Sequence, residues 1–341
     1  MKPYFSGALL CAALAVFAGS AQAQGSGSKT IDDIRGRGQL VCGVSTGVAG
    51  FSLPDSQGVE RGIDADTCRA VAAAILGDGN KIRFVPLTTT NRFTALQSGE
   101  VDLLVRSTTW TLGREANLGL EFAGVNFYDG TGFLANKSLD VKSVKELNGA
   151  TICVQPGTST ELAIADYFRQ NNLKFQPILI QDLAEIQNTF LSGRCDVYST
   201  DMSGLASFRF QQGPKKEDYI LMPEVISKEP LGLMVRKGDD KYFDLVRWTF
   251  IALLQAEESG VTQANVEQMQ SSTNPDIRRL LGAEGDLGKA MGVDNKFAVY
   301  VIKSVGNYGE IWDRNITPMG IPRGLNNLWT KGGLQYPPPM R

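Results

Sequence analysis

The sequence predicts an α/β protein of two lobes, each built on a mainly parallel sheet flanked by helices. The chain has 341 residues, which is more than one hydrophobic core comfortably supports. Apolar strand patterns alternate with helical patterns, as is typical of βαβ units. A weak internal repeat supports two such units, because residues 95–107 and 189–201 both indicate a helix end, a Ser-Gly turn, a strand and a polar tip.

The first half of the chain begins with a strand at residues 40–45, which leads into a turn. Asp64 is then expected to cap a helix that ends at Gly77. A buried strand is expected at Val101–Val105, before the polar tip. The apolar face of the helix would consist of Cys68, Val71, Ala72, Ile75 and Leu76.

The second half repeats this pattern, beginning with a strand at residues 151–155. The run Thr158-Ser159-Thr160-Glu161 is a capping box that opens a helix toward Phe168, and Asp182 with Glu185 opens the next helix. We expect lobe 1 to comprise residues 24–132 and 231–290, and lobe 2 to comprise residues 133–230. Residues 291–341 are expected to pack on a lobe as a clasp, and the chain to cross between lobes near 130–136 and 227–234.

The N-terminus has the pattern of an export signal. Lys2 precedes an apolar run from Ala8 to Ala18, and Ala21-Gln22-Ala23 is a typical cleavage site. A signal peptide at residues 1–23 would place the mature protein in the periplasm, beginning at Gln24. Cys11 faintly resembles a lipidation site, but cleavage there would leave too short a signal.

The cysteines fit an oxidising compartment. Without Cys11, four remain, and three pairings are possible. The preferred pairing joins Cys42 to Cys68 and Cys153 to Cys195, because each bridge then closes a loop within one half of the chain. The alternative is four buried free thiols.

Composition excludes several classes of function. The chain has 34 basic and 36 acidic residues without blocks of like sign, so neither nucleic acid nor an acidic membrane surface is indicated as a partner. It has no histidine, which excludes Ser-His-Asp and Cys-His catalysis and any histidine-containing metal site. No cofactor is indicated.

The polar tips predict a site for a zwitterion. Ser107, Thr109 and Arg114 follow a strand in the first half, and the Arg fork with neighbouring hydroxyls suits a carboxylate. Asp201 falls at the equivalent place in the second half and suits an ammonium group. Because ligands bind outside the carboxyl ends of parallel strands, both tips should face one cleft. The helix beginning at Thr158 adds free N–H groups on the carboxylate side.

The chain resembles the periplasmic amino-acid-binding proteins of ABC importers (solute-binding protein family 3), specifically the glutamate/glutamine/aspartate/asparagine or general L-amino-acid type. The resemblance covers nearly the whole mature chain. It rests on Gly62–Asp66, Asn91–Arg114, Gly157–Glu161, Asp196–Asp201, Lys228–Gly232, Val235–Asp240, Val305–Glu310 and Arg323–Trp329.

The resemblance implies a two-lobe periplasmic binding protein fold (type II) with a two-segment hinge. It implies that Arg114 takes the ligand α-carboxylate with Ser107, Thr109, Thr158 and Ser159, and that Asp201 takes the α-ammonium. Thr89 and Arg92 correspond to positions that approach the ligand side chain. Arg92 as a solvated helix residue is the alternative.

The loop after the first strand departs from many relatives, which place an aromatic lid there. Ser45 to Ala49 lack bulk and charge, and Phe51 is out of register. This favours a broad range of L-amino acids, including glutamate, glutamine, aspartate and asparagine, over strict specificity. The expected partners are free amino acids and the permease subunits of an ABC transporter in the inner membrane, and a monomer is expected.

Two other functions stay open because fold does not fix function. One is a periplasmic enzyme resembling cyclohexadienyl or arogenate dehydratase, with Asp201 or Glu161 as acid or base. The other is a sensory receptor subunit that delivers its ligand to a membrane protein. The residues favour a binding protein that is not an enzyme.

Overall fold

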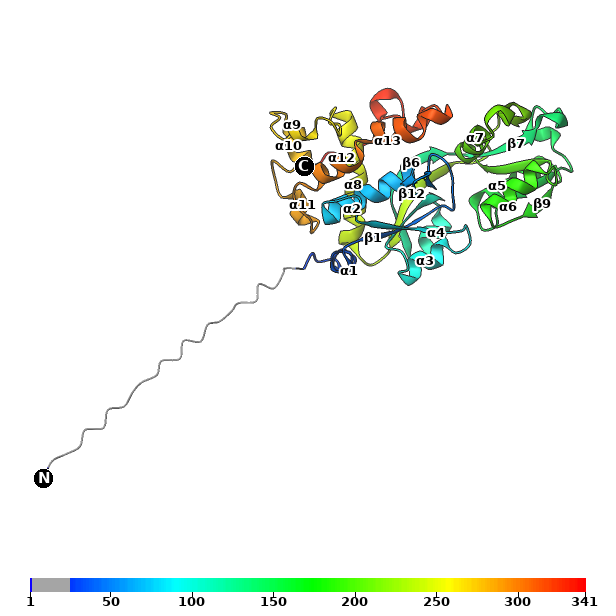
Figure 1. Ribbon diagram of the computed structural model, residues 1–341. Coiled ribbons are helices and arrows are strands. Elements are labelled where there is room, and N and C mark those ends of the chain that lie inside the picture. The colour runs from blue at the N-terminus through cyan, green and yellow to red at the C-terminus, as the bar shows by residue number, and fades with distance from the viewer. Residues whose placement is uncertain (2–24) are drawn as a thin grey trace.

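The structure is a computed structural model and describes Met1 and residues 25–341. It has two lobes, each a five-stranded sheet flanked by helices, and this confirms the predicted two-lobe α/β fold (Figure 1). The expected signal peptide, its cleavage after Ala23 and Cys11 lie outside the described residues. Within those residues, no helix is both long and apolar enough to cross a membrane.

Lobe 1 is built on a sheet of strand order β4-β1-β5-β12-β6. Four strands run in one direction and β12 runs opposite to its neighbours β5 and β6. A short hairpin, β2-β3, follows β1. The strands of this lobe are β1 Leu40–Val44, β2 Leu53–Pro54, β3 Glu60–Arg61, β4 Ile82–Pro86, β5 Leu103–Thr109, β6 Leu120–Asp129 and β12 Glu229–Arg236. Its helices before the C-terminal segment are α1 Lys29–Arg37, α2 Ile63–Leu76, α3 Arg92–Ser98, α4 Leu112–Asn117 and α8 Asp240–Glu258.

Lobe 2 has the same plan, with strand order β11-β7-β10-β8-β9. Only β7 runs against the other strands. The strands are β7 Thr131–Asn136, β8 Thr151–Val154, β9 Gln176–Leu179, β10 Val197–Asp201 and β11 Tyr219–Leu221. The helices are η1 Lys137–Leu139, η2 Val144–Glu146, α5 Ser159–Gln170, α6 Leu183–Leu191, α7 Met202–Gln211 and η3 Gly213–Asp218.

The two sheets are related by the internal repeat. From one edge to the other, β4-β1-β5 of lobe 1 corresponds to β9-β8-β10 of lobe 2, and the next strand in each sheet is the antiparallel one. The repeat seen in the sequence falls on β1 with β8 and on β5 with β10. The polar tips therefore end equivalent central strands of the two lobes.

The chain crosses between the lobes at two adjacent places. β6 ends at Asp129 and β7 begins at Thr131, so Gly130 alone joins the sheets. A Cβ on Gly130 would lie 2.7 Å from the carbonyl oxygen of Ser227 in the second crossing, so the close approach of the two segments requires glycine. The second crossing ends where β12 begins, at Glu229. Both strands thus start two residues before the predicted lobe boundaries at 133 and 231.

The helix caps agree with prediction at Asp182 and in part at Thr158, but not in α2. The capping box predicted at Thr158 is incomplete, because the Glu161 carboxylate accepts the N–H of Gly157 at 2.8 Å. Thr158 accepts the N–H of Glu161, and Asp182 accepts the N–H of Glu185, as predicted. Asp64 is not a cap. The N-cap residue of α2 is Gly62, so the helix has no side-chain cap. The Asp64 carboxyl instead lies buried inside lobe 1. The predicted end of α2 at Gly77 is observed.

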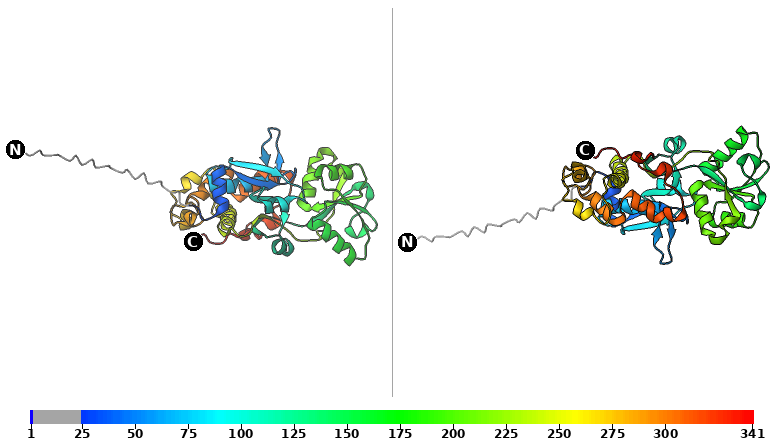
Figure 2. Two further views of the ribbon diagram at one scale, coloured as in Figure 1. Left: turned by 90° about the horizontal axis from the view of Figure 1, so that it is seen from below. Right: turned by 90° about the horizontal axis from the view of Figure 1, so that it is seen from above.

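The C-terminal segment packs on lobe 1 (Figure 2). Its buried residues belong to the hydrophobic core of that lobe. Buried residues of α12 pack with those of α2 and α8 in this core. The fully buried Trp312 stacks on Phe127 of β6 with 5.3 Å between ring centroids. The elements after α8 are α9 Val266–Met269, α10 Pro275–Leu280, α11 Leu287–Ala290, α12 Phe297–Val305, α13 Tyr308–Asn315, η4 Thr317–Met319, η5 Gly324–Asn326 and η6 Trp329–Lys331.

The preferred cysteine pairing is confirmed. Cys42 of β1 bonds Cys68 of α2 with 6.2 Å between Cα atoms, and Cys153 of β8 bonds Cys195 just before β10 with 5.7 Å. Each bridge lies within one lobe and ties a central strand to a neighbouring segment. The bridge in lobe 2 closes the longer loop, with a sequence separation of 42 against 26.

Removing the lobe 2 bridge should destabilise the protein without changing its fold. A Cys153→Ala/Cys195→Ala variant is expected to lose about 2–4 kcal/mol of unfolding free energy, because the bridge restricts the unfolded chain. Urea denaturation of the variant and of oxidised and reduced wild type measures this difference. Equal midpoints for variant and oxidised wild type would contradict the expectation.

Candidate functional site

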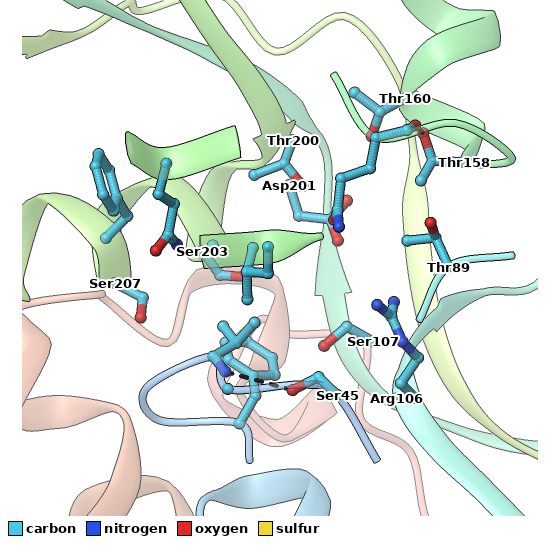
Figure 3. Close-up of a pocket in the computed structure, with 18 of the residues that line it drawn as sticks. Ser45, Thr89, Arg106, Ser107, Thr158, Thr160, Thr200, Asp201, Ser203 and Ser207 are labelled. Atoms are coloured by element: carbon cyan, nitrogen blue, oxygen red, sulfur yellow. Dashed lines mark hydrogen bonds between the residues drawn. The ribbon is translucent and has the colours of Figure 1, made fainter. Parts of the chain in front are cut away.

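A cavity of about 60 Å³ lies between the two lobes, where the tips of β5 and β10 face each other (Figure 3). Both lobes contribute to its wall, and every predicted binding residue except Arg114 lines it. The predicted residues in the wall are Ser45, Thr89, Arg92, Ser107, Thr109, Thr158, Ser159 and Asp201. At the minimum volume that one water needs, the space holds about four waters.

Ser107 lies at the floor of this cavity in an unusual backbone conformation. Its φ is 42°, in the left-handed region, where serine is uncommon. Asp64 stabilises it, because the Asp64 carboxyl accepts the Ser107 N–H at 3.0 Å and the hydroxyl at 3.2 Å. Asn126 donates to the other Asp64 oxygen at 2.8 Å. Burial raises the pKa of Asp64 to about 6 against these hydrogen bonds. Asp64 therefore fixes the orientation of Ser107.

Arg106 is a cavity residue that the sequence analysis missed. It is 7 % exposed, its Nε donates to the Leu87 carbonyl at 2.9 Å, and its guanidinium points into the cavity in Figure 3. Burial lowers its pKa to about 10, so it remains a cation at neutral pH. The available signal was a charged residue directly after the apolar run Leu103–Val105, at the end of a strand expected to be buried, because burying an unpaired cation is unfavourable.

Arg92 is buried and is not a solvated helix residue. It is 2 % exposed in the first turn of α3, and its guanidinium lies 4.7 Å from the ring centroid of Phe93. Burial, more than the neighbouring charges, lowers its pKa well below the usual value. Among the described residues, its Nε and the Thr89 hydroxyl have no hydrogen-bond partner. Both groups are therefore free to bind a polar ligand group.

Arg114 lies behind the cavity wall. Its guanidinium donates to the Thr109 carbonyl at 2.7 Å and lies 5.2 Å from the centroid of the same Phe93 ring. Burial is the main cause of its lowered pKa, and Glu229 and Asp201 oppose that shift. The Phe93 ring thus holds two guanidinium groups beside the cavity, and Arg114 positions the backbone of Thr109.

The start of helix α5 forms the facing wall in lobe 2. Thr158 caps the helix and its hydroxyl donates to the Gln155 carbonyl at 2.8 Å. Ser159 and Thr160 are the first residues of the helix, where backbone N–H groups lack a helical partner and attract anions. The Ser159 hydroxyl lies 2.9 Å from that of Thr109, so the two lobes touch at the cavity.

Asp201 adds an acidic pole to the same cavity. Its pKa is raised well above the usual value, chiefly by burial and then by repulsion from Asp129 and Glu229. Burial also raises the pKa of Asp129 to about 6, although Ser203 and Gly130 donate hydrogen bonds to it. A cation placed beside Asp201 would relieve this repulsion.

The loop after β1 closes the end of the cavity away from Thr158. Gly47 and Val48 line this end, and the Ala49 carbonyl accepts the hydroxyl of Ser207 from lobe 2 at 2.9 Å. The Ser45 hydroxyl donates to the Ser52 carbonyl at 3.3 Å and accepts the Val48 N–H at 3.4 Å. The facing residues of α6 and α7 are uncharged: Leu183, Gln187, Ser207, Phe208 and Gln211. No group of His, Cys, Asp or Glu among the described residues could hold a metal ion.

Comparisons with known proteins agree with this architecture. The chain is 54% identical over 344 residues to the glutamate/glutamine/aspartate/asparagine-binding protein of Rhodobacter capsulatus, covering 100% of this chain and 99% of that protein. It is 52% identical over 341 residues to the general L-amino acid-binding periplasmic protein of Rhizobium johnstonii, covering 98% of each.

A solved structure is similar over nearly the whole described fold. It is an ABC transporter periplasmic binding protein from Brucella ovis with glutathione bound, 53% identical, with a TM-score of 0.89 over 92% of this chain and 99% of that one. Residues 40–269 match the family described as bacterial extracellular solute-binding proteins, family 3. The chain belongs to this family.

Proposed function

We propose that this protein is the periplasmic substrate-binding subunit of an ABC transporter, which captures L-amino acids by closure of the cleft and delivers them to the membrane permease. The observation that carries the proposal is that groups of opposite charge from different lobes face one cavity. Arg92 and Arg106 come from lobe 1, and Asp201 comes from lobe 2. A zwitterion bridging them stabilises the closed form, because only there does it contact both lobes.

The ligand carboxylate lies on the side of Arg114 and helix α5 in this proposal. Arg114 supplies positive charge beside Thr109, and the first turn of α5 supplies N–H groups. The ammonium lies at Asp201, where the carboxylates repel one another. Ser107 and Thr109 complete the lobe 1 side, and the ligand side chain extends toward Thr89 and Arg92, whose free polar atoms suit an amide or a carboxylate.

A broad ligand range is part of the proposal. Ser45, Gly47 and Val48 leave the end of the cavity without bulk or charge, so side chains of different length can be accommodated. The two close relatives are named for several amino acids, which supports this range. The Brucella relative supports adding γ-glutamyl peptides as a second ligand class, since the cavity continues to the exposed Gln211.

Export and partner assignments follow from the same proposal. The expected signal peptide would be cleaved after Ala23, and the loaded, closed monomer would dock on permease subunits in the inner membrane. Binding occurs without turnover, because the chain has no histidine and the site provides charges that clamp a ligand. Conversion of prephenate or arogenate by the purified protein would contradict this and favour the dehydratase alternative. Capture of a chemoreceptor or sensor kinase instead of permease subunits would favour the sensory alternative.

Calorimetric titration tests the proposed function directly. The mature protein, unfolded and refolded to remove any bound ligand, is titrated with the twenty L-amino acids and with glutathione. Tight binding of several amino acids with different side chains is expected. Binding of only one amino acid a thousandfold better than all others would refute the broad range, and binding of none would refute the proposed function.

Arg114→Ala should weaken amino-acid binding by about 2–5 kcal/mol, because the carboxylate side of the cleft loses a buried positive charge and the Thr109 carbonyl loses its donor. The matched control is Arg169→Ala, which removes an exposed Arg of α5 paired only with Asp166 at its surface. Calorimetry of both variants should show unchanged binding in the control. Unchanged affinity in Arg114→Ala would remove this residue from the site.

Binding should be weaker in acid. An ammonium favours ionised Asp201, so binding lowers the raised pKa of this group and releases a proton. Affinity is therefore full above the raised pKa and falls as the pH drops through it. We expect tighter binding at pH 8 than at pH 5, proton release in buffers of different ionisation enthalpy, and weaker binding with less pH dependence in folded Asp201→Asn. Equal affinities at both pH values would contradict this assignment.

A further inference from the structure

Glu229 lies at the junction of the two lobes, and so far only the effect of its charge on Arg114 and Asp201 has been described. It is the first residue of β12, is 2 % exposed, and pairs with Asp129 across the sheet at the point where the chain crosses between lobes. A buried carboxylate needs hydrogen-bond donors. The donors of Glu229 are hydroxyl groups from both lobes and from the second crossing.

Four hydroxyls converge on this carboxylate. Thr109 of lobe 1 donates at 2.5 Å and Ser159 of lobe 2 at 2.7 Å, both to Oε2. Ser227 donates at 2.5 Å and Thr131 at 3.2 Å, both to Oε1. Thr109 and Ser159 also line the cavity and lie 2.9 Å from each other. The Oε2 atom thus shares its two donors with the ligand site.

The number of protons fixes what these two hydroxyls can offer a ligand. Each hydroxyl carries one proton and two acceptor lone pairs, and an ionised carboxylate only accepts. Thr109, Ser159 and Oε2 form a triangle of three contacts served by two protons. No hydroxyl proton is left to donate into the cavity. The pair therefore presents only lone pairs to a ligand.

This result changes the role expected for the hydroxyls of Thr109 and Ser159. The sequence assigned them to the ligand carboxylate, but a carboxylate has only lone pairs and would be repelled by them. A ligand ammonium has three N–H donors and suits them well. The ligand carboxylate then lies beside the guanidinium of Arg114 and the backbone N–H groups at the start of α5.

Resting on the proposed function, we propose that Glu229 is the positioning residue that makes the site selective for an α-ammonium group. By accepting the hydroxyl protons of Thr109 and Ser159, it turns a hydroxyl pair shared by both lobes into an acceptor for that group. Amino acids are thereby distinguished from 2-oxo acids, which carry a carbonyl oxygen instead of N–H donors. Glu229 itself does not need to touch the ligand.

Glu229→Gln tests the inference with little change in shape. When the amide nitrogen takes the place of Oε2 it donates to Thr109 or Ser159, and a hydroxyl proton of that pair becomes free to point into the cavity. The probes are L-glutamate and 2-oxoglutarate, which differ only at the α position, measured by calorimetry and by competition. The ratio of their affinities should fall at least tenfold in the variant, roughly the value of one charge-assisted hydrogen bond. The matched control is Glu224→Gln, since Glu224 accepts the Ser143 hydroxyl at 2.5 Å within lobe 2.

The ratio distinguishes positioning from a purely structural role. If Glu229 only held the lobes together, both ligands would weaken by the same factor and the ratio would stay constant, which would overturn the inference. Thr109→Val provides a second reading if Glu229→Gln does not fold. This variant should bind L-glutamate more weakly and 2-oxoglutarate with unchanged affinity. Equal weakening of both affinities would indicate that the Thr109 hydroxyl binds the ligand carboxylate, which contradicts the inference. Wild type that binds none of the twenty L-amino acids would refute the proposed function and this inference with it.

Discussion

The site depends on the place where the chain crosses between the lobes. Gly130 joins β6 directly to β7, and the second crossing returns at Glu229, beside the tips of β5 and β10. Residues that would bind a ligand and residues that would absorb a hinge motion are therefore neighbours in the same small volume. Asp129 illustrates the coupling, because it ends a strand of lobe 1 and accepts a hydrogen bond from Ser203 of lobe 2.

The electrostatics of the cleft explain why it needs a ligand. Burial lowers the pKa of Arg92, Arg106 and Arg114, while it raises the pKa of Asp129 and Asp201. Burial disfavours the charged form of each of these groups. The two charges of a zwitterion can supply partners to both sets at once. A ligand bearing only one of these charges would leave the other set unsatisfied, which gives the amino-acid backbone its importance over the side chain.

The fold and much of the site could be predicted from the sequence because they follow local patterns. The helix cap at Thr158, the Ser-Gly turns and the repeated polar tips are read from neighbouring residues, and they placed β5 and β10 in equivalent positions. Asp64, Arg106 and Glu229 depend on contacts between residues far apart in the chain. Asp64 has the pattern of a helix cap, yet it turns toward Ser107, 43 positions away. Glu229 accepts a hydrogen bond from Thr109, which lies 120 positions away in the chain, and no spacing rule predicts that contact.

The central claim is that an amino acid bridges the two lobes with its ammonium at Asp201 and its carboxylate beside Arg114 and the start of α5. A crystal structure of the complex with L-glutamate tests it most directly. The account predicts closed lobes, with the ligand nitrogen within about 2.7–3.2 Å of the Asp201 carboxylate and the Thr109 hydroxyl. A ligand bound to one lobe only, or with its carboxylate at the Thr109 and Ser159 hydroxyls, would contradict it.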